Sequence, residues 1–171
     1  HRFAGLVHEG HRLEQDDVRE NDAAETLAAG LCATARHLTA DAPFTGRVNL
    51  HAEAAGVLAL DDAAINALNA VDEAITLATL PRFAAVAAGQ MAATIKIIPY
   101  AVSEADLVRA ERIGRAGSIV SVRTLRRMQV GIILTGSEAA RERIVKAFAA
   151  PLRERVAELG SEARDIAFVA H

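Results

Sequence analysis

The sequence has few aromatic residues and almost no cysteine. Tryptophan is absent and aromatic side chains make up 4% of the 171 residues. A core must therefore be built from Ala, Val, Leu and Ile, with helices and sheets approaching closely. Cys32 is the single cysteine, which excludes an intrachain disulfide and leaves too few thiolates for a zinc site. This usage predicts a reducing, cytoplasmic location.

Other absences narrow the classes of function. The longest apolar runs have the length of a strand, well short of the ~20 residues of a membrane span, so no membrane contact is expected. A net charge of −3 argues against a general nucleic-acid binder. The six histidines show no metal-ligand spacing, and no metal is expected. Motifs of serine hydrolases, phosphate loops and zinc proteases are missing, so no catalytic residue is predicted.

The first part of the chain alternates strand and helix patterns. Asn21 or Asp22 is expected to cap a helix that reaches His37. Asp61 and Ser103 are expected to cap two further helices. The expected strands are two short ones within Arg47–Leu60 around a bend at Gly56, then Ile75–Leu80, Met91–Ile98 and Ile119–Val122. Residues 1–115 are predicted to form a small mixed α+β module.

The last part has a strand–helix–strand rhythm. A buried strand, Gln129–Leu134, precedes a long helix that ends at Gly160 and is kinked or broken at Pro151. Ala163–Val169 follows as a strand expected to lie parallel to the first. We therefore predict an α/β fold in which residues 116–171 start a three-layer α/β domain with a parallel sheet. The boundary is placed in the stretch 115–127.

Three residues at the end of the Gln129–Leu134 strand are candidate ligand contacts: Thr135, Gly136 and Ser137. Backbone N–H groups at a helix start suit an anionic phosphate or pterin group. The alternative is a plain helix cap made by Ser137. Glu138 and Glu142 favour the cap, because they already complement the helix dipole.

A second set of candidates lies around residue 46. Gly46 permits a tight turn after Thr45, and Arg47 and Asn49 point to the same side of the strand that follows. Arg47 is able to hold a phosphate; alternatively the turn is structural and Arg47 pairs with Asp41 or Asp61. Lys96 lies on the strand face opposite its apolar neighbours. It is expected either to contact an anion or to protect an edge strand from aggregation.

One stretch carries a family resemblance: APFTGRVNLHAEAAGVLALD, LNAVDEAITLATLP and GQMAATIKIIPYAV, within residues 41–102. It resembles the N-terminal region of bacterial molybdopterin-binding proteins of molybdenum cofactor biosynthesis. Residues 130–171 resemble the opening of the cofactor-binding domain of that family more weakly. The later loops of the cofactor site and the nucleotide loop of the transferase domain are not in this sequence. The start at His1 and the end at His171 predict a piece of a longer protein.

The resemblance implies binding of molybdopterin, a small pterin ligand, in cofactor biosynthesis or handling. A second hypothesis is a structural or oligomerisation module with no ligand of its own, which forms a homo-oligomer. A third is that the parent protein is a nucleotidyltransferase whose catalytic residues lie outside these 171.

Overall fold

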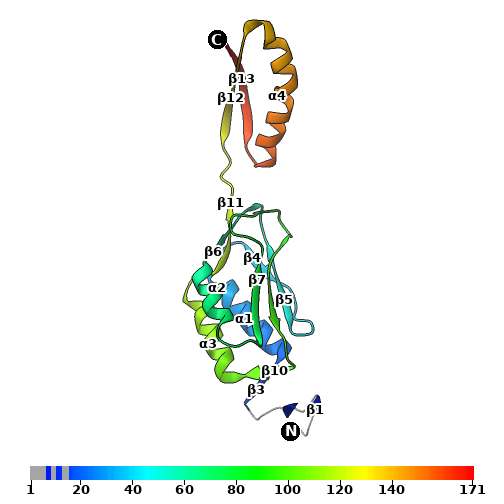
Figure 1. Ribbon diagram of the computed structural model, residues 1–171, viewed down its shortest axis with the longest axis vertical. Coiled ribbons are helices and arrows are strands. Elements are labelled where there is room, and N and C mark those ends of the chain that lie inside the picture. Colours follow the sequence, from blue (N-terminus) through cyan, green and yellow to red (C-terminus); the bar gives the residue numbers. More distant parts are fainter. Residues whose placement is uncertain (1–6, 9–10, 13–15) are drawn as a thin grey trace. The chain divides into compact units, whose positions relative to one another are not determined.

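The chain forms two compact units. The computed structural model describes residues 7–8, 11–12 and 16–171, and the units comprise residues 1–124 and 125–171 (Figure 1). The division lies within the expected stretch 115–127, later than the predicted end of the first module at residue 115. The reason is strand β11 (Val120–Thr124), which pairs antiparallel with β6 (Gly56–Leu60) and so belongs to unit 1.

A four-stranded antiparallel sheet is the centre of unit 1. In spatial order its strands are β4 (Leu38–Ala40), β5 (Arg47–Ala52), β9 (Met91–Ile97) and β7 (Ile75–Thr79). Side chains alternate between its two faces: Val48 and Leu50 are buried, and so are Ile95 and Ile97. The residues between them are partly or fully exposed. The sheet therefore has one apolar face in the core and one polar face toward water.

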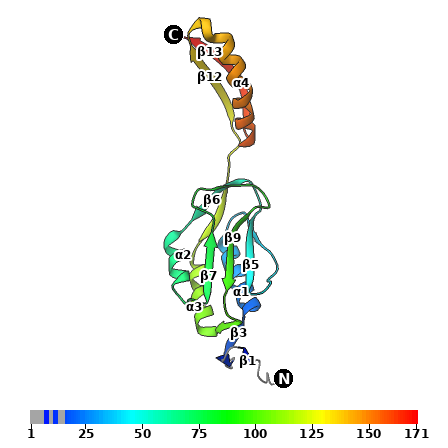
Figure 2. The ribbon, with the colours of Figure 1, turned by 45° about the vertical axis from the view of Figure 1, so that its right-hand side comes forward.

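Two helices, α1 (Glu20–Thr34) and α2 (Asp62–Asn69), pack on the sheet, and a third, α3 (Glu104–Ala116), packs against both of them. Figure 2 shows β5, β9 and β7 side by side, with α1 behind them. Helix α1 packs on β5 and β9, and its residues Ala24, Leu27 and Ala28 are at most 2% exposed. Small buried side chains of this kind allow a helix to approach a sheet closely.

Of the three helix caps predicted in unit 1, two are confirmed. The side chain of Asp61 accepts a hydrogen bond from the N–H of Ala64 (3.0 Å), and Ser103 accepts one from the N–H of Asp106 (3.1 Å). The predicted cap of α1 is wrong: the helix begins at Glu20, and the cap position is held by Arg19. Asn21 instead accepts a hydrogen bond from the N–H of Gly46, 2.8 Å away, and so ties α1 to the turn before β5.

Smaller strand pairs complete unit 1. Strand β6 lies between β11 and β8 (Ala85–Val86), and β3 (Asp17–Arg19) pairs with β10 (Ala101–Ser103). At the start of the chain β1 (Val7–His8) pairs with β2 (His11–Arg12). All of these pairs are antiparallel.

Unit 2 is a strand–helix–strand motif. Strand β12 (Gln129–Gly136) leads through a short 3₁₀ turn, η1 (Glu138–Ala140), into α4 (Arg141–Glu158), and β13 (Glu162–Ala170) returns parallel to β12. Gly160, at φ +70°, follows the end of the helix as predicted. Helix α4 runs through Pro151 without a break.

The predicted parallel-sheet class needs correction. The chain has a mixed α and β fold whose sheets are mostly antiparallel, and among the described residues only β12 and β13 pair in parallel. The prediction that Gln129–Leu134 is buried is also wrong, since Ile133 is 69% exposed. One helix covers one face of this two-stranded sheet, so side chains on the other face meet solvent.

The turn before β5 requires glycine. Thr45 and Gly46 both have positive φ, +47° and +67°, as in two-residue hairpin turns. Phe44 and Arg47 exchange backbone hydrogen bonds across the turn, at 2.9 and 3.0 Å. A Cβ atom at Gly46 would lie 2.6 Å from the carbonyl oxygen of Ile97, which itself belongs to the rigid strand β9.

We predict that Gly46→Ala lowers the free energy of unfolding by about 2 kcal/mol or more, through strain at positive φ and the backbone clash. Gly89→Ala is the matched control: Gly89 has φ +79° but open space around the missing side chain. It should cost about 1 kcal/mol, from the backbone strain alone. Urea unfolding of both variants measures the difference, and equal losses would contradict the role of the Ile97 contact.

Candidate functional site

The candidate residues lie in two places. Thr45, Gly46, Arg47, Asn49 and Lys96 belong to the turn before β5 and to the polar face of the four-stranded sheet in unit 1. The other three candidates, Thr135–Ser137, lie in unit 2 at the end of β12.

Arg47 and Lys96 are direct partners across β5 and β9. Lys96 lies on the face opposite Ile95 and Ile97, as its position in the strand predicted. Its ammonium group donates a hydrogen bond to the carbonyl oxygen of Thr45, which fixes it over the turn. The side chain of Arg47 is exposed. Among the described residues it makes no ion pair with Asp41 or Asp61, the partners that the structural alternative named.

Asn49 is held by its neighbours. Its backbone N–H and its side-chain amide donate to the two carboxylate oxygens of Asp41, at 2.7 and 2.9 Å. Its side-chain oxygen Oδ1 accepts a hydrogen bond from the hydroxyl of Thr94 (2.9 Å). The Asn49 side chain therefore ties the segment before the turn to β5 and β9.

Asp41 and His51 extend this polar network. His51 Nε2 lies 3.6 Å from Asp41 Oδ2, and its Nδ1 lies 3.2 Å from the carbonyl oxygen of Gly89. Partial burial alone would raise the pKa of Asp41, but the hydrogen bonds from Asn49 and His51 outweigh it and hold that pKa below its ordinary value. The sequence indicated Asp41 only as one of two alternative ion-pair partners of Arg47, so its network with Asn49 and His51 was missed.

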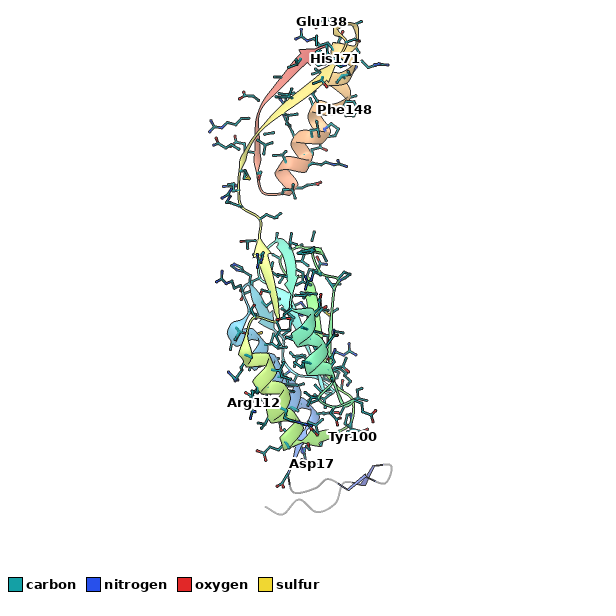
Figure 3. The ribbon with its side chains drawn as sticks, turned by 60° about the vertical axis from the view of Figure 1, so that its left-hand side comes forward. Asp17, Tyr100, Arg112, Glu138, Phe148 and His171 are labelled. Carbon is teal, nitrogen blue, oxygen red and sulfur yellow. The ribbon has the colours of Figure 1, made fainter. Side chains whose placement is uncertain are left out.

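The end of β12 in unit 2 meets the end of β13. The N–H of His171 donates to the carbonyl oxygen of Gly136 over 3.2 Å, and Figure 3 shows His171 and Glu138 at this same end. Ser137 stands at the cap position of η1, yet its side chain makes no capping hydrogen bond. This edge holds the carboxyl ends of two parallel strands, where open α/β sheets bind ligands.

Several residues at this edge also have structural roles. Gly136 is buried, and a Cβ atom there would lie 2.5 Å from Cδ1 of Ile144 on α4. Thr135 and Gly136 belong to β12, which extends two residues beyond the predicted end of the strand at Leu134. Glu138 pairs with Arg141 at 3.0 Å. The ion pair with Arg141 offsets the negative charge of Glu138, which would otherwise repel an anionic ligand.

A depression lies at the other end of the same strand pair. It is lined by Arg127, Met128, Gln129, Ser161 and Glu162. These residues stand at the amino ends of β12 and β13, whereas parallel sheets place ligands at the carboxyl ends. It lies in the connection into β12 and in the turn after α4, and it contains none of the residues predicted from the sequence.

Neither a metal-binding cluster nor a membrane-spanning helix is found in the part of the chain that the structure describes. No group of three or more His, Cys, Asp or Glu side chains there is placed to share a metal ion. The helices between residues 16 and 171 lack the combined length and apolar character that crossing a bilayer would need.

Comparison of the sequence with known protein families and with curated proteins, and of the structure with solved structures, gave no significant match.

Asp41 makes the stability of unit 1 depend on pH. Because the pKa of Asp41 is lower in the folded state, its contribution is complete above about 3.8, its ordinary value. It is lost as the pH falls below 3.8 through the folded-state pKa. At pH 7 we predict that Asp41→Asn lowers the free energy of unfolding by no more than about 1 kcal/mol, since the carboxylate is partly exposed.

The matched control is Asp16→Asn, which changes an exposed aspartate in the same unit. Urea unfolding of both variants between pH 2.5 and pH 7 is the measurement. The gap between wild type and Asp41→Asn should close at the acid end. A gap that stays constant over this range would show that the carboxylate charge is not what stabilises the network.

Proposed function

We propose that the protein binds molybdopterin through unit 2. The observation that carries the proposal is that a parallel strand–helix–strand motif has Thr135–Ser137 at its carboxyl edge, the edge where open α/β folds bind ligands. The resemblance of residues 41–102 and 130–171 to molybdopterin-binding proteins supports the choice of ligand. On this proposal unit 2 is part of a three-layer domain with a parallel sheet, in a cytoplasmic protein.

The chemistry of this edge suits a phosphate-bearing pterin. The first turns of η1 and α4 leave backbone N–H groups without helical partners, and the positive end of the helix dipole favours an anion. The hydroxyl of Ser137 makes no bond to the helix, so it is available to a ligand. His171 lies at the same edge and supplies a further ring donor.

The proposal predicts that purified molybdopterin raises the melting temperature of the chain, because a ligand that binds only the folded state stabilises it. Ser137→Glu should reduce this shift by placing a negative charge beside the phosphate. The melting temperature without ligand should stay nearly unchanged, since Ser137 makes no capping bond that the substitution would remove.

Gln129→Glu is the matched control, because it adds the same charge at the opposite end of the same strand and also at an exposed position. It should keep the full shift. If wild type shows no shift with molybdopterin, or if both variants lose it equally, the proposed site in unit 2 is wrong.

A second candidate function, assembly, is favoured by the exposed apolar side chains of unit 2. Ile133 and Val169 are 69% and 52% exposed on neighbouring strands, and Phe148 is 53% exposed on α4 (Figure 3). Parallel sheets are normally covered on both faces. On this candidate, copies of the chain cover these side chains in a homo-oligomer.

The assembly candidate predicts that the chain sediments as a species larger than a monomer at micromolar concentration. Ile133→Glu should shift it to the monomer, because a charge cannot be buried in an apolar contact without a large cost. Val108→Glu, at an exposed position on α3 of unit 1, should leave the sedimentation unchanged. A wild-type chain that is monomeric throughout would contradict this candidate.

A further inference from the structure

A row of four side chains crosses the polar face of the sheet in unit 1. Phe44 bridges to Arg47, Arg47 pairs with Lys96 on β9, and Lys96 pairs with Thr76 on β7. Residues directly opposite one another in antiparallel pairs lie on the same face. Phe44 is 77% exposed, and no helix covers this face in the described part of the chain. An aromatic ring, two cations and a hydroxyl thus stand in line and meet solvent.

Two like charges directly opposite in a sheet are destabilising, and the nearby acids do not neutralise this pair. Asp41 lies next to Asn49, which is two residues beyond Arg47 on the same face. Both carboxylate oxygens of Asp41 accept hydrogen bonds from Asn49, and one of them faces His51. Glu20 lies beside Gly46. Within the described residues it forms no ion pair with Arg47 or Lys96. The charge of Arg47 is therefore left for a partner from outside.

We propose that this row binds a small phosphate monoester that carries a planar ring. The guanidinium of Arg47 is a flat fork that matches two phosphate oxygens. Lys96 is already fixed by its bond to the carbonyl oxygen of Thr45, so little freedom is lost when an anion approaches it. Phe44, next in line, offers a ring face for stacking. Thr76, at the far end, adds a hydroxyl.

Asn49, which lies beside this row, is not part of the proposed binding site. The amide of Asn49 is occupied by Asp41 and Thr94, so it positions β5 and does not reach a ligand. The site lies wholly in unit 1, and it does not depend on molybdopterin binding by unit 2. Failure of either proposal leaves the other standing, since their variants and their probes differ.

The test is a titration of the ¹⁵N-labelled chain with AMP, adenosine and inorganic phosphate, followed by NMR. AMP should bind more tightly than either of the other two, with shifts at residues 44–47, 76 and 96. Arg47→Ala should weaken AMP and phosphate by about tenfold, the loss of one charge-assisted interaction. Phe44→Ala should weaken AMP and leave phosphate unchanged.

Arg112→Ala is the matched control, because it removes an exposed arginine from α3, on the covered side of the sheet. It should bind AMP like wild type. Without phosphate, Arg47→Ala should melt no lower than wild type, since one of two opposing charges is removed. Equal AMP affinities for the Arg47 and Arg112 variants, or an absence of AMP shifts in wild type at 10 mM, would overturn the proposal. A single-stranded RNA oligonucleotide that binds far more tightly than AMP would also overturn it.

Discussion

The antiparallel pairing of β5 with β9 is the interaction on which unit 1 depends. Val48 and Leu50 on one strand, and Ile95 and Ile97 on the other, place their side chains together in the core. The same alternation puts Arg47 opposite Lys96 and Asn49 opposite Thr94 on the outer face. A slip of the register by one residue would exchange the two faces. Burial of four apolar side chains thereby sets the position of every polar group on the other side.

The turn before β5 holds that register from outside the sheet. The N–H of Ile97 donates to the carbonyl oxygen of Gly46 over 2.7 Å, and Asn21 accepts from the N–H of Gly46. The turn is thus tied to the central strand and to the first helix at once. Arg47 follows it directly, so its backbone is fixed even though its side chain is exposed. A rigid backbone beneath a free cation reduces the entropy that binding must overcome.

Local rules predicted most of unit 1 and less of unit 2. Asp61 and Ser103 cap their helices by bonds that span three residues, and such bonds depend on little beyond the nearby sequence. Asn21 fits the same rule as a cap, but its partner is Gly46, which is distant in the sequence. Contacts of this kind are decided by tertiary structure, and so was the network of Asp41, Asn49 and His51.

The wrong prediction that β12 is buried has a physical cause. An apolar run such as that of β12 predicts burial on both faces, and a parallel partner does follow. Burial of both faces also needs a second layer that covers the sheet, and the pattern of one strand does not show whether such a layer is present. Ile133 and Val169 are exposed for that reason. The apolar pattern of a strand indicates that both of its faces favour burial, whereas the structure shows that only one face of β12 is covered within these residues.

The candidate site residues differ in whether their polar groups already have hydrogen-bond partners within the protein. Arg47 and Asn49 lie on one strand and one face, two residues apart, and the sequence could not rank them. In the structure the amide of Asn49 has partners on both sides, whereas Arg47 has none among the described side chains. A group whose hydrogen bonds are satisfied internally would have to break them to bind a ligand. Arg47 has no such bond to break, so a ligand on this sheet would meet Arg47 first.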